Sequence, residues 1–173
     1  FYSPSKVGGP LIDLHVHDTH FIRLLFGMPR RVMCCGEMQD GLVKYCQTLM
    51  EFDEPGLLVA TSSGVSDQTA RTFCHGFEIQ FERAVAQFEL AVMGDGVSSL
   101  PLKILGQDGV ATDPALAGGD EITAFAAEID ATVTSIASGN PDPRLDVAHA
   151  RDAIHICQCL QQSAESGQWV SCR

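Results

Sequence analysis

The sequence predicts an α+β domain in which helices pack on one face of an open antiparallel or mixed β-sheet. A capped helical stretch comes first, a series of strand-like runs follows, and stretches with helical periodicity end the chain. The turns between the runs are short, which favours antiparallel pairing because parallel neighbours need crossovers of a dozen or more residues. Helices segregated from a run of strands are typical of the α+β class.

The first helix is expected over residues 10–26. Gly8 and Gly9 precede it, and Pro10 occupies a first-turn position where its missing N–H costs nothing. Gly27 follows at the C-terminal cap, with Pro29 just beyond. Both ends of this helix are therefore marked in the sequence.

The strand-like runs lie between residues 32 and 112 and predict a sheet of roughly five to seven strands. Turn sequences separate them, including Gln39-Asp40-Gly41 and Gly94-Asp95-Gly96. Apolar residues fall on both alternations of the runs at 42–52 and 57–65, so we expect the open face of the sheet to mediate self-association. A symmetric dimer, or a tetramer built from such dimers, is expected.

Two helices are expected after the strands. The first begins near Asp120, with apolar residues at helical spacing: Ile122, Phe125, Ile129, Val133 and Ile136. The last runs from about Asp146 to Ser166 and ends at Gly167. Its expected buried face comprises Val147, Ala150, Ile154, Cys157, Leu160 and Ala164.

Composition limits the classes of function. The chain has 173 residues, 45% of them hydrophobic, with 22 acidic against 11 basic side chains and a net charge of −11. This acidic excess argues against a nucleic-acid partner. The sequence has no apolar run near the roughly 20 residues that span a bilayer, so we expect a soluble cytoplasmic protein with no membrane partner. Its seven cysteines form no C-x-x-C pair and are expected to be buried, reduced thiols.

The segment at residues 8–27 concentrates ionisable side chains. If it is helical, Asp13, His17 and His20 share one stripe, so a carboxylate and two imidazoles converge on one surface. Asp13 and His17, one turn apart, would form an acid-base dyad: imidazole has an ordinary pKa of about 6.5 and accepts a hydroxyl proton at neutral pH. The alternative is a polar stripe that only faces water. His15 and Asp18 lie off the stripe and are expected to be packing or solvated residues.

If the same segment is a strand, D-x-H-x-H places Asp13, His15 and His17 on one face. This pattern resembles the first metal motif of amidohydrolases and PHP-type phosphoesterases. Such sites need later ligands from successive strands, and only His75, His149 and His155 remain. A full barrel also needs about 250 residues. The metal hydrolase therefore stays the weaker alternative, and no metal ligands are assigned.

A family resemblance rests on the residues SKVGGPLIDLHVHDTHFIRLLFGMPRRV. They resemble the start of the C-terminal domain of Gfo/Idh/MocA oxidoreductases, the family of glucose-fructose oxidoreductase and inositol dehydrogenase. The family pattern is a Gly-rich entry, D-x-x-x-H on a helix and a Gly-Pro-like exit, which fall here on Gly8, Gly9, Asp13, His17 and Gly27. The closing helix, with its Ser163, Ser166 and Gly167 ending, is similar to that family's last helix.

The resemblance implies a fold, an activity and an assembly. Residues 1–173 would form a single C-terminal domain, similar to that of glyceraldehyde-3-phosphate dehydrogenase, for substrate binding and homo-oligomerisation. An N-terminal Rossmann domain, absent from this chain, would bind NAD or NADP and supply the catalytic Lys, so no cofactor-binding residue is assigned here. The enzyme would oxidise or reduce a sugar, inositol or related polyol, with Asp13 and His17 catalytic, while this chain alone would be inactive.

One departure from the family concerns substrate binding. Three residues after the family's His an Asp is common, whereas this chain has His20, which could hydrogen-bond a polyol or carry positive charge. Arg23 could neutralise an anionic group, so His20 and Arg23 are the expected substrate-binding residues and the substrate could carry an acid. A stand-alone dimerisation or ligand-binding module without catalysis remains the alternative function.

Overall fold

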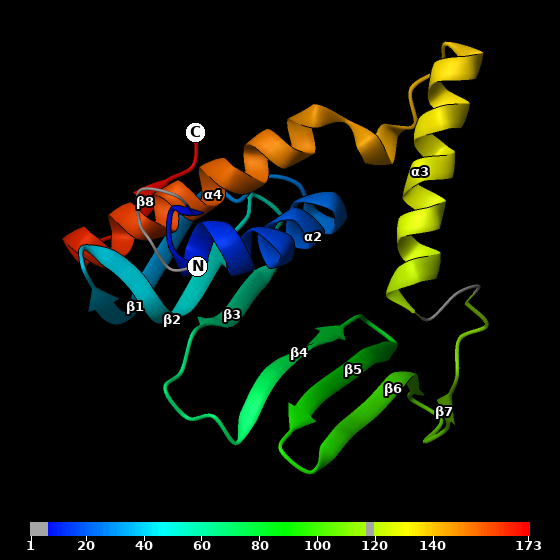
Figure 1. Ribbon diagram of the computed structural model, residues 1–173, viewed down its shortest axis with the longest axis horizontal. Coiled ribbons are helices and arrows are strands. Elements are labelled where there is room, and N and C mark those ends of the chain that lie inside the picture. Colours follow the sequence, from blue (N-terminus) through cyan, green and yellow to red (C-terminus); the bar gives the residue numbers. More distant parts are fainter. Residues whose placement is uncertain (1–6, 117–119) are drawn as a thin grey trace. The chain divides into compact units, whose positions relative to one another are not determined.

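The computed structural model describes residues 7–116 and 120–173 (Figure 1). The chain forms two compact units, one of residues up to Ser66 together with Ile129–Arg173, the other Asp67–Glu128. The predicted α+β class is confirmed, and the strands divide between two four-stranded sheets. No helix among the described residues has the length and apolar character needed to cross a membrane.

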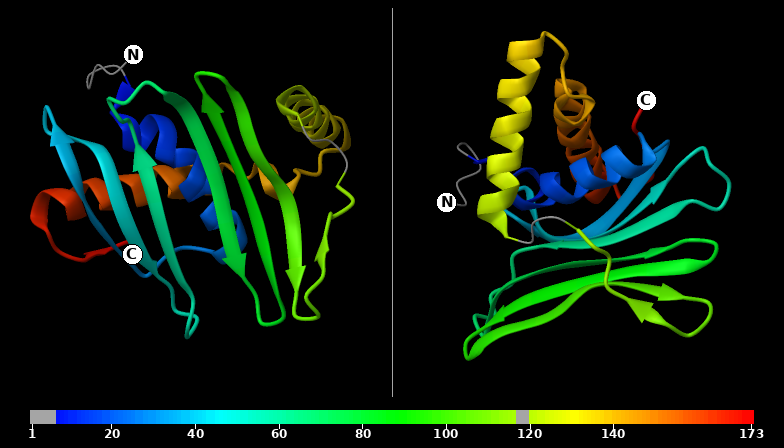
Figure 2. Two further views of the ribbon diagram at one scale, coloured as in Figure 1. Left: turned by 90° about the horizontal axis from the view of Figure 1, so that it is seen from below. Right: turned by 90° about the vertical axis from the view of Figure 1, so that its right-hand side faces the viewer.

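The first unit is a four-stranded antiparallel sheet with helices on one face. Its sheet has the order β3-β2-β1-β8. Its elements are a π-helical turn η1 (Leu11–His15), α2 (Val16–Phe26), β1 (Arg31–Gln39), β2 (Leu42–Glu51), β3 (Leu58–Gly64), a 3-10 turn η2 (Pro143–Leu145), α4 (Val147–Ser166) and β8 (Val170–Ser171). In Figures 1 and 2, α2 and α4 cover the same face of this sheet.

The core of the first unit lies between α4 and this sheet. Val32, Cys46 and Met50 from the strands are almost completely buried, as are Ile156 and Leu160 of α4. Burying each large apolar side chain contributes about 1.5–3 kcal/mol. Strand alternation and helical spacing thus place apolar side chains on facing surfaces.

The buried face of α4 differs from the predicted one. Val147 and Ile154 are exposed, whereas Asp152 and Ser163 are buried with the core residues. The predicted buried face at positions 147, 150 and 154 is therefore wrong, while Cys157 and Leu160 are confirmed. Polar residues can occupy the buried face because each has a partner: the hydroxyl of Ser163 donates to the Gln168 carbonyl (2.6 Å) and accepts from the Cys34 amide (2.9 Å).

The second unit is an antiparallel meander. Its strands are β4 (Arg71–Gln80), β5 (Ala84–Met93), β6 (Gly96–Gly106) and the two-residue β7 (Ala111–Thr112), in that spatial order. The ring of Phe88 lies 5.9 Å from that of Phe77 across the β4–β5 pair. The expected strands are confirmed, but β7 and β8 were missed because two residues carry no periodicity.

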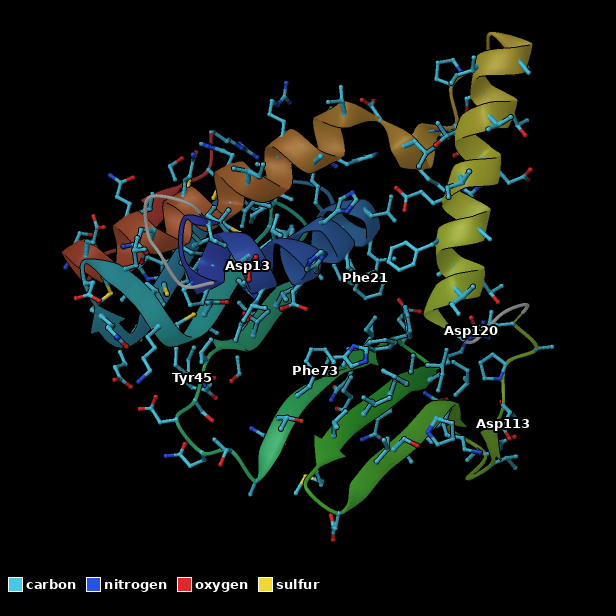
Figure 3. All side chains as sticks on the ribbon, viewed as in Figure 1. Asp13, Phe21, Tyr45, Phe73, Asp113 and Asp120 are labelled. Atoms are coloured by element: carbon cyan, nitrogen blue, oxygen red, sulfur yellow. The ribbon has the colours of Figure 1, made fainter. Side chains whose placement is uncertain are left out.

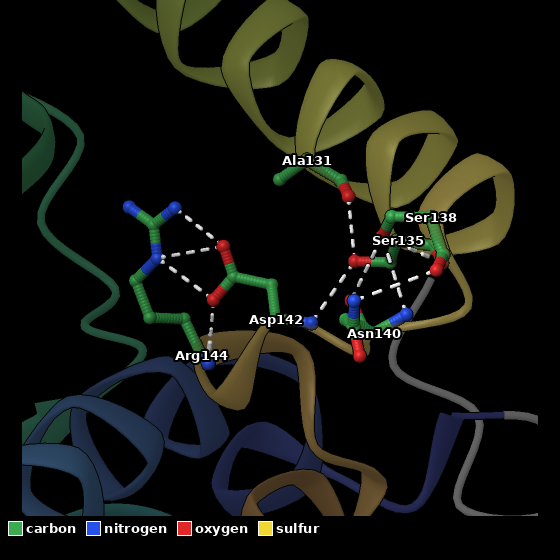
Figure 4. Close-up of polar contacts among 6 residues, drawn as sticks. All are labelled: Ala131, Ser135, Ser138, Asn140, Asp142 and Arg144. Carbon is green, nitrogen blue, oxygen red and sulfur yellow. Dashed lines mark hydrogen bonds and ion pairs between the residues drawn. The ribbon is translucent and has the colours of Figure 1, made fainter.

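Helix α3 (Glu121–Ser138) follows this meander and leads into η2 and α4. The hydroxyl of Ser135 donates to the Ala131 carbonyl (2.7 Å) and accepts from the Asp142 amide (2.9 Å) (Figure 4). The Asp142 carboxylate pairs with the Arg144 guanidinium at 2.6 Å. Hydrogen bonds from Arg144 lower the pKa of Asp142 to about 2. These contacts fix the turn that precedes α4.

Predicted caps fix both ends of α4. The Asp146 carboxylate accepts from the Ala148 amide (2.9 Å), and Gly167 ends the helix in the left-handed region at φ 65°. A side chain with a Cβ is strained in that conformation, so glycine suits the position. Both predicted ends of the last helix are confirmed.

Glu51 joins the start of β1 to the end of β2. Its carboxylate accepts from Arg30 (2.8 Å) and from two nitrogens of Arg31 (2.7 and 2.8 Å). The Arg31 guanidinium also stacks on the Trp169 ring at 4.5 Å, which brings the C-terminal segment onto β1. Hydrogen bonds from Arg31 and then Arg30 lower the pKa of Glu51 to about 2.

We expect Glu51→Gln to lower the melting temperature at pH 7. A glutamate pKa of about 2 in the folded state, against about 4.3 when unfolded, contributes stability above the unfolded value that is lost as pH falls towards 2. The difference in melting temperature between the native protein and the variant should therefore shrink between pH 5 and pH 2. Thermal melts followed by circular dichroism check this, with Glu54→Gln as the exposed control; a difference that does not change with pH contradicts it.

The cysteines predict a pattern of chemical reactivity. All seven are free; five are buried, while Cys35 and Cys74 are exposed, which corrects the expectation that all are buried. Burial raises the pKa of Cys157 to about 11 and that of Cys172 to about 12, which suppresses the reactive thiolate. Brief iodoacetamide treatment at pH 7.5 should label Cys35 and Cys74 first, as mass spectrometry of peptides will show. Equal labelling of native and urea-unfolded protein would contradict the buried assignments.

Candidate functional site

The predicted site begins with a tight glycine entry into the π-helical turn. The Gly9 carbonyl accepts from the amides of Ile12 (3.1 Å) and Asp13 (3.0 Å). Gly9 has φ 85°, and a Cβ there would lie 2.8 Å from Cδ1 of Leu42. Glycine is therefore required both by the backbone conformation and by the close approach to β2.

The π turn and α2 divide their residues between two faces. Leu11, His15, Thr19 and Ile22 are buried, at the spacing of one helical face. Asp13 and His20 are half-buried and His17 is exposed, so the predicted stripe faces away from the core. Figure 3 shows Asp13 on this N-terminal helical segment, with Phe21 further along α2.

Asp13 and His17 share this accessible surface but are not hydrogen-bonded to each other in the part of the chain that the structure describes. Both side chains are open to a ligand, as acid-base groups must be. Hydrogen bonds of catalytic pairs often tighten only when substrate is bound. The structure thus supplies both groups on one face.

His15 has a structural role, as the sequence suggested. Its ring is completely buried; Nδ1 lies 2.8 Å from the Asp18 carboxylate and Nε2 lies 3.2 Å from the Thr61 hydroxyl on β3. Thr61 in turn contacts the Thr48 hydroxyl at 2.5 Å. A neutral imidazole satisfies every group: Thr48 donates to Thr61, Thr61 to Nε2, and Nδ1–H to Asp18. This series of hydrogen bonds fixes the π turn to the sheet.

The segment is helical, so the strand interpretation of D-x-H-x-H is wrong. His15 turns into the core while Asp13 and His17 face outwards, and the three side chains do not converge. Among the described residues, no group of three or more His, Cys, Asp and Glu side chains is arranged to hold a metal ion. The metal hydrolase alternative therefore loses the pattern on which it rested.

Thr19 and Arg23 attach α2 to α4. The buried Thr19 hydroxyl donates to the Ala153 carbonyl (3.2 Å) and the Val16 carbonyl (3.1 Å). Nε of Arg23 donates to the Asp152 carboxylate at 2.9 Å, and Arg151 binds the same carboxylate at 2.6 Å. Burial raises the pKa of Asp152, but hydrogen bonds from Arg151 and Arg23 outweigh this and leave the pKa below its usual value. Arg23 therefore holds the helix pair together.

His20 lies beside a histidine to which the sequence assigned no role. Its ring centroid is 6.3 Å from that of His149, in the first turn of α4, with an angle of 42° between the rings. Nδ1 of His149 is buried without a hydrogen-bond partner in the described part of the chain. No periodicity could reveal this pairing, because it depends on how α2 and α4 pack.

The other histidines lie elsewhere. His75 is exposed on β4, with its ring 5.2 Å from that of Phe88. His155 is exposed on α4, 3.7 Å from Sγ of Cys159. A hollow of about 230 Å³ is lined by Gly8, Leu11, Ile12 and residues of α4, and does not include Asp13 or His17.

The described strands do not form the parallel sheet of a Rossmann dinucleotide site. Every strand pair among them is antiparallel, whereas the Rossmann fold requires parallel strands joined by crossover helices. The residues described here therefore do not build the Rossmann cradle for NAD or NADP.

A model of the GFO/IDH/MocA C-terminal domain matches residues 1–111 of the chain. The chain belongs to the Gfo/Idh/MocA family. The family pattern in the sequence, with its Asp13 and His17, lies within the matched region, as do the π turn and the strands β1, β2 and β3. No significant match was found among curated proteins.

Solved structures show the same fold as this Gfo/Idh/MocA domain. An oxidoreductase from Desulfitobacterium hafniense, provisionally described as NADPH-dependent, matches with a TM-score of 0.75 at 18% identity, over 99% of this chain and 50% of that one. Levoglucosan dehydrogenase with NADH and levoglucosan has a TM-score of 0.71 at 16% identity, over 98% and 52%. Myo-inositol dehydrogenase from Corynebacterium glutamicum has 0.59 at 12%, over 96% and 50%. The chain thus spans about half the length of these proteins.

We expect Thr61→Val to destabilise the first unit by about 1–3 kcal/mol, because it leaves Nε2 of buried His15 and the hydroxyl of Thr48 without their shared partner. Urea unfolding followed by circular dichroism measures this loss. Thr72→Val, on exposed β4, is the matched control and should stay within about 0.5 kcal/mol. Equal effects of the two substitutions would show that the His15 network contributes nothing to stability.

Proposed function

We propose that this chain is the substrate-side domain of an NAD(P)-dependent oxidoreductase that acts on a hydroxyl of a sugar, inositol or related polyol. The observation that carries the proposal is the D-x-x-x-H pair: Asp13 and His17 lie on the accessible face of a helix in a Gfo/Idh/MocA domain. Similar folds in levoglucosan dehydrogenase and myo-inositol dehydrogenase support the substrate class. The dinucleotide would be held by a separate domain that joins this one.

His17 is proposed to move the proton. Its imidazole is exposed and can accept a hydroxyl proton at a ring nitrogen. The carboxylate of Asp13 stabilises the imidazolium that results. In the opposite direction the imidazolium returns the proton to the oxygen. Both steps use only groups on the outward face of the π turn and α2.

The rigid attachment of the π turn supports this role. The Gly9 carbonyl holds the turn through Ile12 and Asp13, and His15 fixes it to β3. Positioned groups contribute more to rate than mobile ones, because the ordering entropy is lost on folding and not on substrate binding. His15, which lies between Asp13 and His17, thus holds the backbone of the proposed site in place.

We expect His17→Ala in the complete enzyme to lower kcat by about 10²–10⁴, the contribution of a positioned acid-base group. Asp13→Asn should lower kcat less, because the imidazole remains. Reduction of NAD and NADP with a panel of polyols, followed at 340 nm, measures this. His75→Gln, an exposed histidine on β4, is the control and should retain activity. Full activity of the His17→Ala variant would refute the proposed function.

Self-association through the open sheet face is also part of the proposal. The face of the first sheet opposite α4 carries Leu49. Leu58 lies on the same face, because it pairs with Glu51, two residues after Leu49 on β2. Leu49 is 40% and Leu58 is 58% exposed, which is unusual for strand residues that alternate with a buried core. Burial against a second copy would remove this apolar surface from water.

We expect Leu49→Lys to weaken self-association, because a charge at the centre of an apolar interface must be desolvated. Size-exclusion chromatography with light scattering should give a dimer or tetramer for the native protein and a monomer for the variant at the same concentration. Leu145→Lys, at an exposed residue of η2, is the control and should not change the mass. A native protein that is monomeric at micromolar concentration would contradict sheet-mediated assembly.

A further inference from the structure

Two imidazoles from different helices meet beside the proposed catalytic pair. His20 lies one turn after His17 on α2, and its ring centroid is 6.3 Å from that of His149 on α4. A direct hydrogen bond between two imidazoles would bring the centroids within about 5 Å, given a donor-acceptor distance near 2.9 Å. The rings are therefore too far apart to satisfy each other.

Neither ring has a polar partner in the part of the protein that the structure describes. Nδ1 of His149 is buried and makes no hydrogen bond within the described residues, and the structure gives His20 none in the same part of the chain. A buried polar atom without a partner costs about 1–3 kcal/mol, so its presence in a folded protein calls for an explanation. A ligand atom that enters between the rings, with a small rotation of either side chain, would supply the missing hydrogen bond.

The carboxylates near the pair on α4 already have partners. Asp152, one turn after His149, is bound by Arg23 and Arg151, and Asp146, one turn before it, caps the helix by accepting from the Ala148 amide. The two guanidinium groups balance these two carboxylates. Asp18 on α2 is occupied by His15. The imidazoles thus lack a free carboxylate from these neighbours, which leaves their N–H groups to an acceptor from outside.

The same arrangement distinguishes a carboxylate from a phosphate. Phosphate groups are most often bound by guanidinium forks, which match their geometry and double charge. Here Arg23 and Arg151 direct guanidinium nitrogens at Asp152. Two imidazole N–H groups, each donating one hydrogen bond, match the two oxygens of a singly charged carboxylate.

We propose that His20 and His149 bind a carboxylate of the substrate, so that the enzyme acts on a polyol acid. The inference rests on the proposed function. His17 would address the reacting hydroxyl, while His20, one turn further along α2, and His149 hold the acid group. His149 is then a specificity-determining residue that the sequence alone did not identify.

The proposal is tested by the binding of glucuronate and glucose, which differ only in the oxidation of one carbon to a carboxylate. Isothermal titration of the 173-residue chain should give a Kd for glucuronate at least about tenfold lower than for glucose. In NMR spectra, the ring protons of His20 and His149 should shift with glucuronate, while those of His155 on the exposed side of α4 should not. Equal affinities, or no binding of glucuronate, would overturn the proposal.

Two variants separate binding from folding. His149→Leu removes a buried atom that has no partner, so we expect the melting temperature to stay the same or rise while glucuronate affinity falls about tenfold. His149→Asn keeps an N–H near the position of Nδ1 and should restore most of the affinity. A structural histidine would give the opposite result, with lower stability and unchanged affinity.

The outcome is independent of the test of the proposed function. If His17→Ala abolishes turnover in the complete enzyme but acid and neutral substrates are used equally well, the carboxylate site is wrong and the oxidoreductase proposal stands. If glucuronate affinity depends on His149 but His17→Ala retains full activity, the carboxylate site stands as a binding site and the proposed catalysis fails.

Discussion

The burial of one face of α4 is the interaction on which the rest of the first unit depends. Ile156, Cys157 and Leu160 are completely buried against the sheet and α2, and the free energy of burying them fixes the direction of the helix. Ser163 then bonds to β1 through the Cys34 amide, and Ala153 accepts from Thr19 of α2. Once these contacts form, the positions of Asp152 and His149 follow from helical spacing.

The site arises because one short helical segment serves both the core and the solvent. The π turn and α2 send His15 inwards, where the hydroxyl of Thr61 satisfies its ring, and leave Asp13 and His17 outwards. A buried histidine suits position 15 better than an apolar residue, because its hydrogen bonds fix the orientation of the side chain as well as its burial. The orientation of the outward groups is thereby coupled to the sheet.

The helices and strands could be predicted from local signals in the sequence. The features that depend on long-range contacts could not. Caps at Gly27 and Gly167 and turns at Gly41 and Gly96 depend on neighbouring residues, so helix ends and strands could be located. The buried face of α4 could not be predicted in this way, since the burial of Asp152 depends on Arg23, 129 residues away. The division into two sheets was missed because the link between β3 and β4 resembles the other turns. Asp13 and His17 were proposed from the spacing of the motif, whereas His149 lies beside His20 only through tertiary packing.

The distribution of charge gives the last constraint on the site. A protein with a net charge of −11 repels anions in general, so an acidic substrate needs local compensation. Arginines at the junction of α2 and α4 would provide it directly, but Asp152 neutralises one of the two and holds Arg23 in the helix contact. The other guanidinium, of Arg151, is 75% exposed, so its charge is screened by solvent. The two imidazole N–H groups are then the donors left to bind one carboxylate. Discrimination between acid and neutral polyols would then depend on two rings on different helices, and so on the same packing of α4 that stabilises the fold.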